Sequence, residues 1–156
     1  MLSIIGCGNP NRKDDGVGVY VAQSLLVWHA GQNIPDIAIY DAGTAGMDVM
    51  FKARGSDTLF IIDANLSQSQ PGSLFIVPGE ELANIPEPSY NLHDFRWDNA
   101  LYAGKKIYQD EFPDNITVFL IEAASVELGI GLSKPVLATA DKVIEKIKQQ
   151  IGRYVQ

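Results

Sequence analysis

The segment LSIIGCGNP (residues 2–10) decides the fold class, because its short apolar run stops at a turn built from two glycines, an asparagine and a proline. Such a run predicts a buried β-strand that ends at a turn. The pair Asp14 and Asp15 follows, and apolar residues then recur at helical spacing from Val17 to Gly31. Acidic residues before such a segment and a glycine after it are typical of a helix. The N-terminal part of the chain therefore predicts a strand, a turn and a helix.

The same alternation continues along the chain, where short apolar runs predict strands and amphipathic segments predict helices. Pro71 and Gly72 form a turn signal, and the connection is so short that we expect the strand after it to lie antiparallel to the strand before it. This pattern predicts a single α/β domain over residues 1–156, with a mainly parallel sheet covered by helices on both faces in three layers. The expected strands are 37–40, 58–62, 73–77 and 116–121, and the expected helices are 47–52, 94–108 and a last one capped by Ser133.

The composition excludes several classes of protein. With 46% hydrophobic and 20% charged residues among 156, the chain has enough apolar material for a core. It carries 12 Lys and Arg against 19 Asp and Glu, a formal charge of −7 without a basic stripe, so we expect no nucleic-acid partner. The chain starts without a basic leader, and no apolar run approaches the roughly 20 residues that cross a bilayer. We therefore expect a cytoplasmic protein that does not associate with a membrane.

The chain has one cysteine, Cys7, and two histidines, His29 and His93. These numbers exclude a disulfide framework and a zinc site built from cysteines and histidines. Any metal that the protein holds must therefore be bound mostly by carboxylates, with one or two imidazoles. Cys7 lies among glycines at the end of a predicted strand, with no second cysteine, and we interpret it as a small buried filler.

Acidic residues follow three of the predicted strands or their turns: Asp15, Asp41 and Asp63. The carboxyl ends of parallel strands meet at one edge of a sheet, so we expect these acids to converge there. Asp63 follows the most hydrophobic run of the chain, where desolvation opposes its charge unless a cation or hydrogen-bond donors lie nearby. Two structural roles compete with a functional one: acceptance of backbone amides by Asp63 in its own turn, and capping of the first helix by one residue of the Asp14-Asp15 pair.

His93 lies between a polar segment and a predicted helix, and a lone histidine in such a place is usually solvated or capping. Together with Asp15 and Asp63 it would supply two oxygens and one nitrogen with open coordination positions, which suit metal-assisted hydrolysis or capture of a metal carried by a partner. His29 falls late in the first predicted helix, where we expect a surface position or a C-terminal cation.

The glycine turn at residues 6–8 also raises the alternative of a phosphate site. A dinucleotide fingerprint requires a third glycine at a fixed spacing, and the sequence lacks it. Asp14 and Asp15 would moreover repel a phosphate and attract a cation. A nucleotide-binding domain is therefore disfavoured.

Taken in order, these motifs resemble the endopeptidases that mature nickel-iron hydrogenases, and the resemblance covers nearly the whole chain. Each motif is weak alone, but the set is specific. The motifs are Gly6-Cys7-Gly8-Asn9-Pro10, Asp14-Asp15-Gly16-Val17-Gly18, Asp41-Ala42-Gly43-Thr44-Ala45-Gly46, Ile62-Asp63-Ala64, Pro71-Gly72, Leu92-His93-Asp94 and Gly131-Leu132-Ser133.

The resemblance implies a cytoplasmic metal-linked endopeptidase that removes the C-terminal extension of a nickel-iron hydrogenase large-subunit precursor after nickel insertion. It implies that Asp15, Asp63 and His93 bind the metal and act in catalysis, with nickel supplied by the substrate and zinc or cadmium able to take its place. It also implies a twisted sheet of about five strands between helices. Asp41 is the candidate residue that orients the site or acts as its base. Asn9, Gly43 and Thr44 are the predicted substrate-binding residues.

The sequence departs from the family pattern in two places. Asp15 stands where several members have glutamate, which shortens the reach of the carboxylate by one methylene. After His93 the residues Asp94-Phe95-Arg96-Trp97-Asp98 are bulkier and more charged than the family pattern, and we expect Arg96 and Trp97 to reshape the rim of the substrate groove. The alternative function is a non-catalytic assembly factor that binds the immature large subunit and senses its metal.

Overall fold

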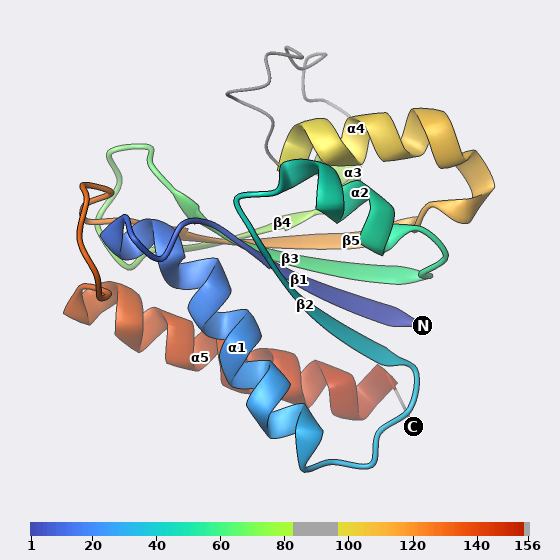
Figure 1. The fold of residues 1–156 in the computed structure, drawn as a ribbon, viewed down its shortest axis with the longest axis horizontal. Coiled ribbons are helices and arrows are strands. Elements are labelled where there is room, and N and C mark those ends of the chain that lie inside the picture. The colour runs from blue at the N-terminus through green and yellow to red at the C-terminus, as the bar shows by residue number, and fades with distance from the viewer. Residues whose placement is uncertain (83–96, 155–156) are drawn as a thin grey trace.

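The structure is a computed structural model that describes residues 1–82 and 97–154. Strands and helices alternate along most of these residues (Figure 1). The strands are β1 (Leu2–Cys7), β2 (Ile37–Gly43), β3 (Thr58–Asn65), β4 (Leu74–Pro78) and β5 (Asn115–Glu122). The helices are α1 (Val17–Ala30), α2 (Gly46–Ala53), α3 (Gly79–Leu82), α4 (Trp97–Tyr108) and α5 (Lys134–Tyr154), with short 3-10 helices η1 (Lys13–Gly16) and η3 (Gln109–Glu111).

The strands form one five-stranded sheet in the order β2-β1-β3-β5-β4. Neighbouring strands are parallel except for β4, which pairs antiparallel with β5. The predicted α/β fold with a mainly parallel sheet is therefore confirmed. β4 runs antiparallel to β3, as expected from the turn at Pro71 and Gly72, but β5 lies between the two strands. A turn signal predicts the direction of the next strand. It does not predict whether a strand from later in the sequence, here β5, lies between the two strands that the turn connects.

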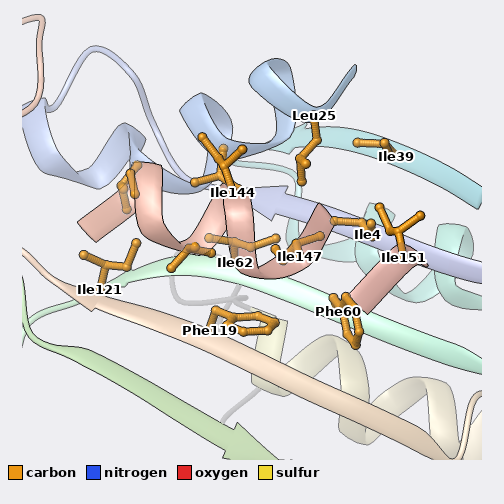
Figure 2. Packing of buried hydrophobic residues seen from close by; sticks show 14 of the residues in the cluster. Ile4, Leu25, Ile39, Phe60, Ile62, Phe119, Ile121, Ile144, Ile147 and Ile151 are labelled. Carbon is orange, nitrogen blue, oxygen red and sulfur yellow. The ribbon is translucent and has the colours of Figure 1, made fainter. Parts of the chain in front are cut away.

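Helices cover both faces of the sheet, which confirms the predicted three layers. Figure 1 shows α1 and α5 on one face and α2 and α4 on the other. On the first face, Leu25 of α1 and Ile147 of α5 belong to one buried cluster with Ile62 of β3 (Figure 2). In the same cluster the rings of Phe60 and Phe119 meet edge to face, with their centroids 5.7 Å apart. Burial of these apolar side chains is the main force that holds the layers together.

The start of α1 lies very close to the sheet because the contact is made by glycine. A Cβ atom at Gly18 would collide with the backbone oxygens of Cys7 and Ile62, and one at Gly6 would collide with the backbone oxygen of Gly18. Backbone can approach backbone at this distance only where both side chains are absent. The close contact places the residues that precede α1 beside the carboxyl ends of β1 and β3.

The described part of α4 falls within the expected helix 94–108, whose first three residues lie outside the described part of the chain. Within residues 1–82 and 97–154, no helix combines the length and the hydropathy that crossing a bilayer requires.

Candidate functional site

A pocket of about 360 Å³ opens at the edge of the sheet where the parallel strands end. Its wall comes from the turn after β1, the segment after β2, the end of β3 and two residues from later in the chain. Because the carboxyl ends of parallel strands meet at this edge, segments far apart in the sequence share one surface. The lining residues are Cys7, Gly8, Asp15, Gly43, Thr44, Gly46, Asp63, Ala64, Asn65, Leu66, Trp97 and Val126.

The structure brings Asp15 and Asp63 together on this pocket. Asp15 lies in η1, and its Oδ2 accepts a hydrogen bond from the backbone amide of Asn9 at 3.0 Å. Asp63 lies near the end of β3 and is only 7% exposed, and its Oδ1 accepts the amide of Ala64 at 2.8 Å. Asp63 therefore accepts a backbone amide in its own turn, which is the structural role considered above, and it also lines the pocket.

Gly8 lies between these two acids. A Cβ atom at this position would collide with the backbone oxygen of Asp15 and would lie 3.7 Å from Asp63 Oδ1. Gly8 also has a φ of +132°, a conformation that residues with a side chain rarely adopt. Glycine at this position therefore lets the backbone of η1 lie against the turn after β1, next to the Asp63 side chain.

The charge of this pocket favours a cation. Two carboxylates line it, and the lining residues that the structure describes include no lysine, arginine or histidine. Carboxylate oxygens bind metal ions and repel phosphate. Among residues 1–82 and 97–154, no group of three or more histidine, cysteine, aspartate or glutamate side chains is placed to hold a metal ion. His93, the third predicted ligand, lies outside the described residues, so the three-residue metal site stays a prediction.

Asp14 does not cap the first helix, and neither does Asp15. The N-cap residue of α1 is Gly16, which makes no side-chain capping hydrogen bond. The Asp14 side chain is 1% exposed and faces the segment before α5. Its Oδ1 accepts the amide of Ser133 at 2.7 Å, and its Oδ2 accepts the Ser133 hydroxyl and the amide of Ala124, both at 2.8 Å. Asp14 therefore joins the segment before α1 to the segment before α5.

The other predicted site residues occupy different positions. Gly43 and Thr44 line the pocket, whereas Asn9 is not one of the lining residues and donates its backbone amide to Asp15. Asp41 is exposed and is not one of the lining residues; its Oδ1 accepts the amide of Gly43 at 2.9 Å, and its Oδ2 accepts from Gln23. Asp41 can therefore orient the Gly43 end of the pocket wall.

Three further predictions concern residues beside or away from the pocket. Cys7 is buried, as expected of a filler, and also lines the pocket. Trp97 is buried at the start of α4 and lines the pocket, while Arg96 lies outside the described residues. The expected reshaping of the rim of the substrate groove by these two residues stays a prediction. His29 lies in the last turn of α1, where its Nε2 is 3.1 Å from the oxygen of Ile34.

Sequence reasoning missed Glu122, which ends β5 and is 1% exposed. A signal was present, because Glu122 directly follows an apolar strand just as Asp63 does. Burial raises the pKa of Glu122, but hydrogen bonds from the amide and hydroxyl of Ser67 and from the side chain of Asn65 outweigh burial and hold that pKa below its usual value. Glu122 is therefore a buried carboxylate beside the pocket wall whose ionised form these hydrogen bonds favour.

Comparisons with known proteins show the family to which the chain belongs. A family model described as hydrogenase maturation protease matches residues 19–150. Hydrogenase 2 maturation protease of Escherichia coli is 29% identical over 148 residues, which cover 94% of this chain and 87% of the relative. Coenzyme F420 hydrogenase subunit delta of Methanothermobacter thermautotrophicus is 27% identical over 160 residues, covering 97% and 94%. The solved hydrogenase maturating endopeptidase HybD from E. coli superposes with a TM-score of 0.80 at 26% identity, covering 98% of this chain and 93% of that chain. The chain therefore belongs to the hydrogenase maturation protease family.

Proposed function

We propose that the protein is a metal-linked endopeptidase that removes the C-terminal extension of a nickel-iron hydrogenase large-subunit precursor after nickel has been inserted. Membership of the maturation protease family supports the proteolytic activity. The observation that carries the site is the placement of two carboxylates, Asp15 and Asp63, on one pocket at the carboxyl edge of the sheet. The reaction belongs to the cytoplasm, where a lone thiol such as that of Cys7 stays reduced.

In this proposal, Asp15, Asp63 and His93 hold the nickel that arrives with the precursor, and zinc or cadmium would occupy the same ligands. Two carboxylates on a pocket without a described cationic lining residue suit such an ion. The bound ion supplies Lewis acidity to the scissile carbonyl and to water. The hydrogen bond from the backbone amide of Asn9 fixes Asp15, and the one from the backbone amide of Ala64 fixes Asp63, so both carboxylates are oriented before the substrate arrives.

The remaining predicted residues position the precursor chain. Gly43 and Thr44 form part of the pocket wall, where their backbone can lie against an extended peptide. Asp41 bonds the amide of Gly43, so it acts in this proposal as an orienting residue. Asn9 acts through its amide bond to Asp15.

The test incubates the purified protein with the nickel-loaded precursor and, separately, with its nickel-free form, and measures the mass of the large subunit. The proposal predicts a shortened product with the nickel-loaded precursor and an intact chain without nickel. Equal cleavage of both forms would refute the nickel dependence and leave the peptidase. Intact precursor in both reactions, with a folded preparation that binds the precursor, would refute the peptidase and support the assembly factor.

A further inference from the structure

The Glu122 carboxylate accepts hydrogen bonds from the last residue of β3 and from the segment that follows this strand. Its Oε1 accepts from the Asn65 side-chain nitrogen at 3.0 Å and from the Ser67 hydroxyl at 2.7 Å. Its Oε2 accepts the amide of Ser67 at 2.9 Å. Hydrogen bonds to a charged acceptor are stronger than those between neutral groups, so this contact fixes the backbone of residues 65–67.

The backbone of Glu122 holds the other end of the same loop. Its oxygen accepts the amide of Gly72 at 2.8 Å, and its amide donates to the oxygen of Ser73 at 2.8 Å. The loop 66–72 is thus attached at both ends to one residue of β5. A loop that is already ordered by a buried anchor has less conformational entropy to lose when a ligand binds, so binding costs less free energy.

The segment that Glu122 fixes forms part of the pocket wall. Asn65 and Leu66 line the pocket, and the leucine side chain is 66% exposed. Val126 and Trp97 line the same pocket, so it presents apolar surface as well as the two carboxylates. An exposed leucine on an anchored backbone is suited to bury its surface against an incoming apolar group.

We propose that Glu122 is a positioning residue that holds Leu66 in the pocket wall, where Leu66 contacts an apolar side chain of the precursor next to the bond that is cut. The proposal rests on the proposed function for the identity of the substrate. The anchoring itself concerns this chain alone and can be tested without substrate.

The first experiment measures hydrogen exchange of the Ser67 amide in the free protein. In E122Q an amide group replaces one carboxylate oxygen, and it cannot accept from every donor that Glu122 serves. Exchange at Ser67 is expected to become about tenfold faster or more. E127Q is the matched control, because Glu127 is an exposed acid that contacts only Lys13 among the ion pairs of the described residues. An unchanged exchange rate in E122Q would overturn the anchoring.

The second experiment measures the dissociation constant, KM and kcat for the nickel-loaded precursor in L66A, E122Q and the double variant. Each single variant is expected to weaken binding and raise KM about tenfold with kcat nearly unchanged. The double variant is expected to be no weaker than the single ones, because both changes remove the same contact. L128A is the control: Leu128 is 77% exposed and is not one of the lining residues. Additive losses, or a fall in kcat at constant KM, would overturn the proposal.

Two variants keep the result decisive if E122Q does not fold. Ser67→Ala removes the hydroxyl, which also bonds Asn65 and Ser69, but keeps the backbone amide bond to Glu122, so it is expected to give a smaller change in the same direction. L66A leaves the anchor intact. If the wild-type protein binds the precursor without cutting it, the peptidase is refuted while the binding series still decides the inference. If it does not bind the precursor, the contact with Leu66 is refuted, and the exchange experiment still decides the anchoring.

Discussion

The carboxylate of Asp14 accepts hydrogen bonds from both the amide and the hydroxyl of Ser133, at 2.7 Å and 2.8 Å. This contact joins residues 119 positions apart in the sequence and ties the segment before α1 to the segment before α5. Asp15, the next residue, lines the pocket. The position of a pocket carboxylate therefore depends on a contact with the segment that precedes the last helix.

We expect Asp14→Asn to lower the free energy of unfolding by about 2 to 3 kcal/mol, because an amide group would face a buried N–H donor in either orientation. Ser133→Ala, which removes only the hydroxyl donor, should cost about 1 kcal/mol. Urea denaturation of both variants and the wild type measures these changes. A cost for Asp14→Asn equal to that of Ser133→Ala would show that the backbone amides contribute nothing to the contact.

We expect Gly8→Ala to be more harmful than the same change at another glycine with positive φ. Gly8 has a φ of +132° and Gly131 a φ of +105°, so alanine at either position would carry backbone strain of about 1 kcal/mol or more. A Cβ at Gly131 meets no described atom within 4 Å, whereas at Gly8 it collides with the backbone of Asp15. Gly8→Ala should therefore lose roughly 2 kcal/mol more stability than Gly131→Ala and should lose precursor cleavage. Equal losses of stability for the two variants in thermal denaturation would contradict the close contact between Gly8 and the backbone of Asp15.

The contribution of Glu122 to stability should depend on pH. Its pKa is lower in the folded protein than in the unfolded chain, so its ionised form favours folding. This contribution is complete above the unfolded pKa of about 4.3 and disappears as the pH falls through the lower folded value. The difference in unfolding free energy between the wild type and E122Q, measured from pH 7 downward, should therefore shrink below about pH 4.3. A difference that grows in that range would contradict the lowered pKa.

The two histidines should differ completely in their effect on activity. His93→Ala is expected to slow precursor cleavage at least about 100-fold, because it removes a proposed metal ligand. His29→Ala is the matched control, since its described contact is with the oxygen of Ile34 at the end of α1. Single-turnover cleavage followed by mass spectrometry checks both, with circular dichroism to confirm folding. Wild-type cleavage by His93→Ala would remove His93 from the site.

Much of the fold could be predicted because its signals are local. The apolar run that ends at Asp63, the glycine turn at residues 6–8 and the periodic segment after Val17 each predict an element, and the alternation of elements predicts a parallel sheet. The neighbour of β4 could not be predicted, because β5 reaches its place between β3 and β4 through a connection that no local pattern describes.

The pocket shows the same difference between features with a local sequence signal and features set by contacts between distant segments. Asp15 and Asp63 could be brought together from the sequence because parallel strands present their carboxyl ends at one edge. The roles of Asp14 and Glu122 could not, because their partners are set by tertiary structure: Asp14 meets Ser133, and Glu122 meets Ser67 from 55 positions away. A buried acid at a strand end predicts the need for partners without identifying them.

In the proposed reaction, Asp15 and Asp63 act as one unit in the cleavage of the precursor. The most direct measurement is the single-turnover cleavage rate of the nickel-loaded precursor by Asp15→Asn, Asp63→Asn and the double variant, with the exposed Asp110→Asn as a control for the loss of one acid. We predict that each single variant loses at least about 100-fold, that the double variant is no slower than the slower single one, and that the control is unchanged. Cleavage at the wild-type rate by either single variant would contradict the claim.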